Sequence, residues 1–179
     1  MANIDTFKAS FKDGGARTSQ FEVYITNPID PTSDAETPLR CKAAQLPGRT
    51  INNIDVSYFG RPIKVAGNST YEDWTVTFFN NEDFRIHDGL MAWANAINQP
   101  VENVRGTATS SILEYKSTAL VYQKSQTGKI VKVFEVVGIY PTNISAIELS
   151  WDNEAVQEFQ VTFAVDYWVE VEGVGETTV

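Results

Sequence analysis

The feature that most constrains the fold is the alternation of side chains along the C-terminal run Val156–Trp168. Successive side chains of a β-strand point to opposite faces, so a period of two sorts this run into two sets. One set is apolar and the other is mostly polar: Phe159, Val161, Phe163, Val165 and Tyr167 against Gln160, Thr162, Ala164, Asp166 and Trp168. We therefore predict one long antiparallel strand that lines a core on one side and meets water or another subunit on the other.

The size and composition of the chain favour one globular domain over residues 1–179. With 179 residues, 42% of them hydrophobic, the folded chain can bury roughly 70% of the surface that it exposes when unfolded. The sequence starts with no secretory signal pattern and has no apolar run near the roughly 20 residues that span a bilayer. We therefore expect synthesis in a cytoplasm and no membrane association. The single cysteine, Cys41, is expected to be buried as a small hydrophobe.

The charge balance argues against a protein that binds nucleic acid tightly. Asp and Glu number 23 against 14 Lys and Arg, which gives a formal net charge of -9. Nucleic-acid binding depends on cations that neutralise phosphates, and an acidic surface repels them.

Further periodic segments predict the partners of the C-terminal strand. We expect strands at residues 21–26, 41–46, 71–80, 113–121 and 129–137, with turns at 125–128 and 140–143. Apolar residues at spacings of three and four predict one flanking helix over about Asp83–Asn98, capped by Asn80 or Asn81: Phe84, His87, Leu90, Met91, Ala94 and Ile97, with Trp93 broadening the stripe. We expect a short helix around Phe7–Phe11 that ends at Asp13–Gly15, and loops at residues 27–38 and 101–111.

Residues 49–69 match neither a core strand nor a helix. Apolar and polar residues alternate there, but Gly60, Pro62 and Gly67 interrupt the pattern. We predict two short strands joined by a turn at residues 59–62, which form a β-hairpin arm that projects from the body. The predicted contacts with another subunit are Ile54, Val56, Tyr58 and Phe59. A hairpin folded back onto its own domain fits the composition equally well.

The sequence has none of the common catalytic or metal-binding patterns. It lacks a nucleophile elbow, a paired-histidine helix, a cysteine cluster and a glycine-rich phosphate loop. His87 is the only histidine, so a metal site would lack companions, and we expect a packed or rim position for it. We therefore expect no enzyme, no cofactor and no metal.

A series of segments, in order, resembles the tail tube proteins of contractile-tailed bacteriophages. The likeness extends from Phe21 to Trp168, and five segments carry it: Cys41–Pro47, Gly60–Asn68, Tyr71–Thr77, Gly138–Asn143, and Leu149–Asp152 continuing through Phe159 to Asp166–Trp168. The segment Asn27–Pro38 and the C-terminal tail Val169–Val179 look longer than the family usually has, and Tyr140 stands where a tryptophan is expected.

The resemblance implies a mainly β fold, an antiparallel sandwich or barrel-like domain with one flanking helix and a projecting arm. It also implies hexameric rings that stack into the inner tail tube of a virion, assembled in the host cytoplasm. The implied partners are further copies of the chain, a tail sheath protein outside, a baseplate and a tail terminator at the ends, and phage DNA that passes without specific binding. Because the chain is acidic, we expect the wall facing DNA to be smooth and polar or acidic.

The sequence also fits two other functions. The same subunit could build the tube of a phage-derived contractile injection or secretion particle without DNA. A carbohydrate-binding β-sandwich would also be acidic and rich in aromatic residues, although Trp74, Trp93, Trp151 and Trp168 lie where core packing explains them as well.

Overall fold

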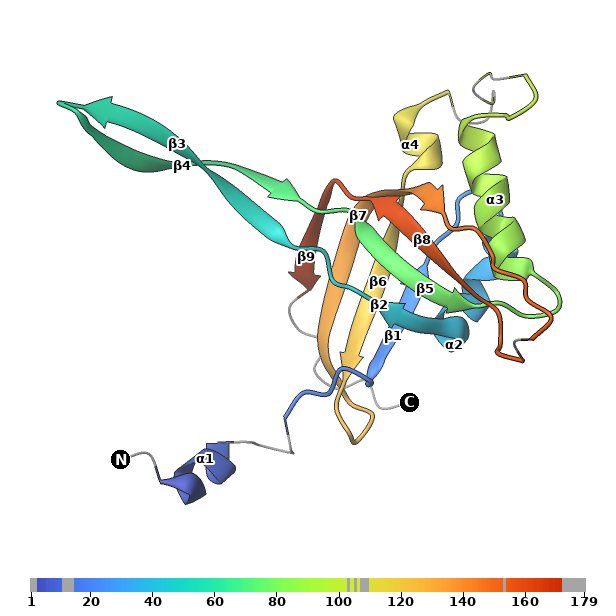
Figure 1. Cartoon of the computed structure of the whole chain (residues 1–179), viewed down its shortest axis with the longest axis horizontal. Helices are drawn as coiled ribbons and strands as arrows, with labels where there is room; N and C mark the ends of the chain where they lie inside the picture. The colour runs from blue at the N-terminus through green and yellow to red at the C-terminus, as the bar shows by residue number, and fades with distance from the viewer. Residues whose placement is uncertain are drawn as a thin grey trace.

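The computed structural model describes residues 3–10, 15–102, 104, 106, 110–152 and 154–171. Figure 1 shows a β-rich body, a long two-stranded arm on one side and a helix on the opposite side. The helices are α1 (Ile4–Ser10), η2 (Pro31–Glu36), α2 (Thr37–Arg40), α3 (Arg85–Ile97) and α4 (Ile112–Tyr115). The strands are β1 (Phe21–Ile25), β2 (Cys41–Ala44), β3 (Arg49–Tyr58), β4 (Arg61–Tyr71), β5 (Trp74–Phe79), β6 (Ser117–Lys124), β7 (Ile130–Ile144), β8 (Glu158–Ala164) and β9 (Tyr167–Val171).

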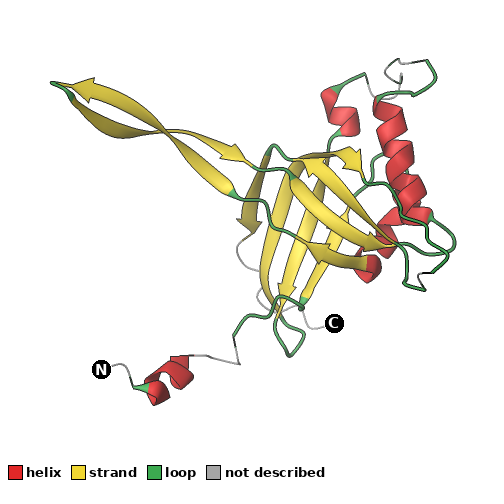
Figure 2. Cartoon of the chain, in the orientation of Figure 1, coloured by secondary structure: helices red, strands yellow, loops and turns green. Residues whose placement is uncertain are grey.

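The body is a sandwich whose two layers share the long strand β7. Layer A contains β1, β6, β9 and the first part of β7, and layer B contains β2, β5, β8 and the last part of β7. All strand pairs in the body are antiparallel, and Figure 2 shows these strands in yellow. The two inner faces meet in one core, which confirms the predicted mainly β antiparallel fold with a flanking helix and a projecting arm.

The core is built from the residues that the alternation of β5 and β8 turns inward. Trp74, Val76 and Phe78 of β5 are fully buried, and Phe159, Val161 and Phe163 of β8 are at most 2% exposed. Facing aromatic rings pair across these strands, with centroids 5.6 Å apart for Trp74 and Phe163 and 5.7 Å apart for Phe78 and Phe159. The predicted inner faces of these two strands are confirmed.

The strand β7 carries the chain from one layer into the other. It runs for 15 residues without a turn, so the turn predicted at residues 140–143 is wrong. In its place, a bulge between Pro141 and Asn143 bends the strand, and residues from Tyr140 onward pair with β8. Proline has no N–H to donate, and it is tolerated in a strand at such a bulge or at an edge.

Gly138 lies in β7 just before this bend, at φ +74°. A Cβ added there would lie 2.1 Å from Oδ2 of Asp166. We expect Gly138→Ala to lower the free energy of unfolding by about 2–4 kcal/mol, because the left-handed backbone and the steric clash both disfavour a side chain. The measurement is chemical denaturation followed by circular dichroism.

Gly128 offers the matched control for this substitution. It also has a positive φ, +80°, but nothing lies within 4 Å of an added Cβ. Gly128→Ala should therefore cost only the backbone term of about 1 kcal/mol. Equal losses for the two variants would contradict the close approach of Asp166 to Gly138.

The C-terminal run is two strands and not one, which corrects the prediction of a continuous strand over Val156–Trp168. β8 ends at Ala164 and β9 begins at Tyr167. Between them, the Asp166 backbone N–H donates to the Val137 carbonyl at 3.2 Å, and the Asp166 carboxylate accepts from Lys116 Nζ at 2.7 Å. These contacts hold the junction beside Gly138, so β8 belongs to layer B and β9 to layer A.

The inner and outer faces exchange at this junction. Tyr167, predicted on the apolar face, is 45% exposed. Trp168, predicted on the opposite face, packs against the core with its ring centroid 6.0 Å from that of Phe134. The predicted alternation therefore holds through Val165, which packs against the core, and fails from Tyr167 onward.

The flanking helix α3 begins later than predicted and has no side-chain cap. Its N-cap is Phe84 at φ +52°, so the predicted cap at Asn80 or Asn81 is wrong. Asn80 is buried and donates through Nδ2 to Oε1 of Gln157 at 2.7 Å. That bond joins the end of β5 to the start of β8.

The buried face of α3 is also offset from the predicted stripe. Ile86, Gly89, Leu90 and Trp93 are buried, whereas Phe84 and Met91 are each 38% exposed. The cause is a contact that periodicity does not show: η2 packs against Gly89, where an added Cβ would lie 2.8 Å from Ser33 Oγ.

Residues 27–38 are more ordered than the predicted loop. They contain η2 and the start of α2, with Asn27 and Ser33 buried. Asp30 caps η2 by accepting from the Thr32 backbone N–H at 3.1 Å, and Asn27 Nδ2 donates to the Gly89 carbonyl at 2.9 Å. These bonds fix the segment against α3.

The strand predicted at residues 113–121 starts only at Ser117, because α4 precedes it. Ser111 and Glu114 form a capping box that begins this helix. A serine followed three residues later by a glutamate is a known helix start, so this helix could have been predicted from the sequence.

The two ends of the chain are described only in part. The predicted N-terminal helix is present as α1, but its predicted end at residues 13–15 falls mostly outside the described residues. Val169–Val171 belong to β9, and the rest of the predicted tail lies beyond the described part. None of the described helices has the length and apolar character needed to cross a membrane.

Candidate assembly surfaces

The arm, Arg49–Tyr71, is a hairpin closed by a two-residue turn. Phe59 and Gly60 have φ angles of +47° and +78°, the combination required at both central positions of a type I′ turn. Tyr58 pairs with Arg61 directly across this turn. The turn is therefore shorter than predicted, and Arg61 and Pro62 already belong to β4.

The register of the arm gives it one apolar face. Ile54 pairs with Val65 and Val56 pairs with Ile63, and directly opposed residues share a face. We call the apolar arm face the set Ile54, Val56, Tyr58, Ile63 and Val65, which are 48–65% exposed, with Phe59 at the tip 91% exposed. All four predicted contact residues are thus accessible, and Ile63 and Val65 were missed although β4 alternates in the same way.

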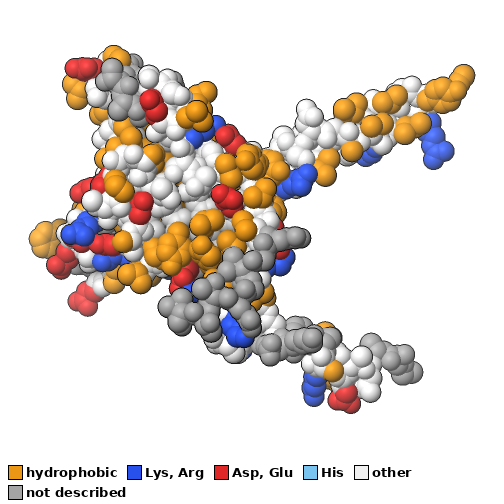
Figure 3. Space-filling model, turned by 180° about the vertical axis from the view of Figure 1, so that it is seen from behind, with side chains coloured by type: hydrophobic (Ala, Val, Ile, Leu, Met, Phe, Trp, Pro, Cys, Tyr) orange, Lys and Arg blue, Asp and Glu red, His pale blue; other side chains and the backbone are white. Residues whose placement is uncertain are grey.

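The arm stands away from its own domain. Every residue of β3 is exposed, and the hairpin projects from the body in Figure 1. The alternative of a hairpin folded onto its own domain is therefore wrong. Figure 3 shows hydrophobic side chains over most of the arm and Lys and Arg side chains toward its free end.

The outer face of layer B is a second distinctive surface, because it is polar and nearly free of charge. Thr75 of β5 pairs with Thr162 of β8, which also pairs with Asn143 of β7. Thr77 pairs with Gln160 in the next row. At the border, Lys42 Nζ contacts Glu158 Oε1 at 2.5 Å, so these two charges neutralise each other.

Layer B also ends in two strand edges that the described part of the chain leaves unpaired. There, β2 pairs with β5 alone, and residues 140–144 of β7 pair with β8 alone. Unpaired backbone groups along an edge are a template for pairing with another chain.

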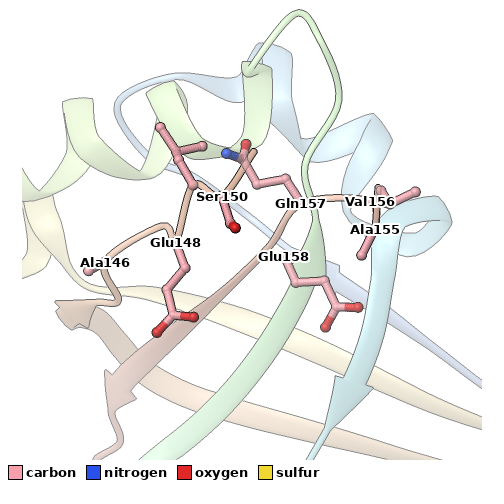
Figure 4. A pocket seen from close by; sticks show the side chains of 8 residues that line it. Ala146, Glu148, Ser150, Ala155, Val156, Gln157 and Glu158 are labelled. Atoms are coloured by element: carbon pink, nitrogen blue, oxygen red, sulfur yellow. The ribbon is translucent and has the colours of Figure 1, made fainter. Parts of the chain in front are cut away.

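The hollow in Figure 4 contains few ionisable side chains. It is lined by the β7–β8 connection and the start of β8: Ala146, Glu148, Leu149, Ser150, Ala155, Val156, Gln157 and Glu158. Glu148 and Glu158 are its ionisable side chains, and the latter already pairs with Lys42. Within the described residues, no group of three or more His, Cys, Asp and Glu side chains could hold a metal.

The same connection exposes three large apolar side chains. Trp151 is fully exposed, Leu149 is 85% exposed and Val156 is 65% exposed. The core position proposed for Trp151 is therefore wrong, whereas Trp74 and Trp93 are fully buried and Trp168 packs against the core.

His87 and Cys41 have packing roles. The imidazole of His87 lies edge-on to Phe159, with ring centroids 5.4 Å apart, on the rim of α3. Cys41 is half-buried at the start of β2, and burial raises the pKa of its thiol from 9.0 to about 12.

We expect Cys41 to resist alkylation in the folded chain. Since the thiolate is the reactive form, a thiol whose pKa is raised to about 12 is almost wholly protonated near pH 8, and it should react about a hundredfold or more slower than in the unfolded chain. The measurement is iodoacetamide labelling followed by mass spectrometry, with urea-unfolded protein as the control. Equal labelling of folded and unfolded chains would contradict the burial of the thiol.

Known proteins share both the sequence pattern and the fold of this chain. The profile of the family described as phage tail tube protein matches residues 16–171. Tail tube protein gp19 of Enterobacteria phage T4 is 33% identical over 168 residues, which cover 92% of this chain and 98% of that protein.

Solved structures with this fold come from contractile assemblies. The sheath/tube terminator of the PVC extracellular contractile injection system, in its extended state, has a TM-score of 0.64 at 13% identity, covering 87% of this chain and 95% of that one. A chain of the PVC sheath-tube complex has a TM-score of 0.59 at 12% identity, covering 96% and 99%. At these identities the likeness shows the fold alone.

Proposed function

Because the chain belongs to the phage tail tube protein family, we propose that six copies join into a ring and that these rings stack into the inner tube of a contractile tail. The protein is a structural component of the virion, a tail tube protein of a contractile-tailed phage. The observation that carries the proposal is the combination of unpaired layer B edges with an exposed apolar arm.

Lateral contact between copies would use the two edges of layer B. The free edge of β2 in one copy pairs with the end of β7 in the next, so that layer B continues from copy to copy. Such a contact joins two different surfaces of the chain. It produces a closed ring when a whole number of copies completes a full turn. The ring removes the edges that would otherwise invite uncontrolled pairing.

Axial contact would use the arm. In this proposal Ile54, Val56, Tyr58 and Phe59 of one ring bind a copy in the neighbouring ring. These side chains are exposed in the single chain, and a contiguous exposed apolar surface is typical of a protein–protein interface. A head-to-tail contact along an axis does not close, and it therefore builds a filament.

The bore of the tube would be lined by the outer face of layer B. Its Thr, Gln and Asn side chains present hydroxyl and amide groups without net charge. DNA binding requires cations at the surface, so this wall would let a duplex slide without adhesion. Repulsion from the acidic remainder of the protein extends only about 8 Å at physiological salt. A bore dominated by Lys and Arg would contradict this part of the proposal.

The proposed partners are a sheath protein on the outside, and a baseplate and a terminator at the two ends. Structures of the same fold are described as parts of sheath–tube, terminator and baseplate assemblies, which supports this set. The role is structural, and the proposal assigns the chain no catalysis, no cofactor and no membrane contact.

The second candidate function is a tube subunit of a DNA-free injection particle. It is favoured because a chain from the sheath-tube complex of an extracellular contractile injection system has the same fold as this chain.

The test is negative-stain electron microscopy of the purified protein at increasing concentration. We expect rings and stacked tubes with a central channel. A population that remains single compact particles at every concentration, including with added baseplates as seeds, would contradict the proposal. Binding of glycans by such particles would instead favour the carbohydrate-binding reading.

A further inference from the structure

The arm is a basic element of an acidic protein. It carries Arg49, Arg61 and Lys64 against Asp55 alone, a net charge of +2, whereas the whole chain has a net charge of -9. The rest of the chain therefore has a net charge of -9 - 2 = -11. Opposite charge of this size attracts the arm of one copy to the body of another.

The basic side chains of the arm lie on different faces. Arg61 is paired with Tyr58, so it stands at the end of the apolar arm face nearest the tip. Lys64 is paired with Asp55 on the opposite, polar face. A body surface that binds the apolar arm face would therefore meet Arg61 and not Lys64.

The outer face of layer A has the matching character. One row across this face runs Tyr24, Leu120, Glu135 and Val169 on four neighbouring strands. Adjacent rows add the apolar side chains of Tyr122, Val137 and Tyr167. Figure 3, which views the molecule from the side of β1, β6 and β7, shows hydrophobic side chains gathered on the body below the root of the arm.

Glu135 is the exception in this face. Its carboxylate lies in the row between Leu120 and Val169 and forms no ion pair with any residue that the structure describes. Glu22, the other carboxylate nearby, is already paired with Lys124. An apolar partner that covered this face would bury the Glu135 carboxylate without a counter-ion. That burial is unfavourable unless the partner supplies a cation.

We propose that the apolar arm face of one copy docks on the outer face of layer A of a second copy, with Arg61 paired to Glu135. This inference rests on the proposed tube function and names the surface that receives the arm. The dimensions agree. Residues 54–58 of an extended strand span about 13 Å, and four strands of layer A span about 14 Å from first to last. The arm therefore crosses the strands of layer A with its apolar side chains against them.

Charge reversal tests the pairing. Arg61→Glu places a carboxylate against Glu135, and Glu135→Arg places a guanidinium against Arg61. We expect each single variant to raise the protein concentration needed for tube formation by about tenfold or more, and the double variant Arg61→Glu/Glu135→Arg to restore it to within about threefold. The assay is pelleting of tubes over a concentration series, with circular dichroism to establish that each variant is folded.

Lys64→Glu is the matched control, because it makes the same charge change on the other face of the arm. We expect a smaller effect from it, and no rescue by Glu135→Arg. Suppose that the wild-type chain forms tubes but Arg61→Glu has no effect, or that the double variant assembles no better than the single variants. Either result would overturn the Arg61–Glu135 pairing and leave the tube function intact. Failure of the wild-type chain to form tubes would overturn the tube function and this inference with it.

Discussion

Replacing Tyr58 and Phe59 by serine is expected to leave a folded, soluble monomer that no longer polymerises. Both rings lie at the tip of the arm, 65% and 91% exposed, and pack edge to face with centroids 4.5 Å apart. Neither ring contributes to the core, so stability should change by no more than about 0.5 kcal/mol. Exposed aromatic anchors of this kind supply a large share of interface energy, often 2 kcal/mol or more each. The measurement is tube yield by pelleting and electron microscopy.

Two control variants separate the contribution of the rings from that of the arm as a whole. Tyr58→Phe/Phe59→Tyr keeps both rings and should assemble normally. Asn53→Ser/Asp55→Ser changes the polar face of the same strand and should retain most of the tube yield. A normal yield from the serine variant of Tyr58 and Phe59 would exclude the arm tip from the axial contact.

Trp93→Ala should have the largest effect on stability, a loss of about 3–5 kcal/mol. Trp93 is fully buried on α3, and its indole Nε1–H donates to the Tyr115 carbonyl at 2.8 Å. Its ring also lies 6.2 Å from that of Phe163, centroid to centroid. The substitution would leave a cavity between α3 and layer B and would remove the hydrogen bond to the Tyr115 carbonyl. Since domains of this kind are stable by only about 5–15 kcal/mol, much of the folded population would be lost near body temperature.

The measurement is guanidinium denaturation followed by tryptophan fluorescence and circular dichroism. Met91→Ala, at a 38% exposed position of the same helix, is the matched control and should cost at most about 1 kcal/mol. A similar loss for both variants would contradict the orientation of α3, with Trp93 inward and Met91 outward.

Periodicity in the sequence was sufficient to find the inner faces of β5 and β8. Their apolar residues alternate without interruption, and each strand is buried on one side only, so a period of two identifies the core. The arm could be predicted for the opposite reason. The apolar residues of 49–69 have no helical spacing, and Gly60, Pro62 and Gly67 interrupt their alternation. A hairpin outside the core was therefore the structure that fitted this segment.

The misread elements are those whose conformation depends on distant contacts. The break at Asp166 depends on Gly138 and Lys116, both far away in the sequence. The buried face of α3 depends on the packing of η2 against Gly89. Pro141 signalled a turn, but layer B offers it an edge position in β7, where no N–H is needed.

The candidate assembly surfaces were predictable only in part. Ile54, Val56, Tyr58 and Phe59 were found because the arm lies outside the core pattern. The outer face of layer A was not found, because the side chains around Glu135 come from four strands distributed from β1 to β9. Only the register of those strands brings them into one row.

The most direct test of the account is a cryo-electron microscopy reconstruction of the assembled tube at side-chain resolution. The account predicts that the backbone of Cys41–Ala44 in each copy hydrogen-bonds to residues 140–144 of its neighbour, and that Thr75, Thr77, Gln160 and Thr162 face the bore. A tube in which these edges stay unpaired, or in which this face of layer B points away from the bore, would contradict it.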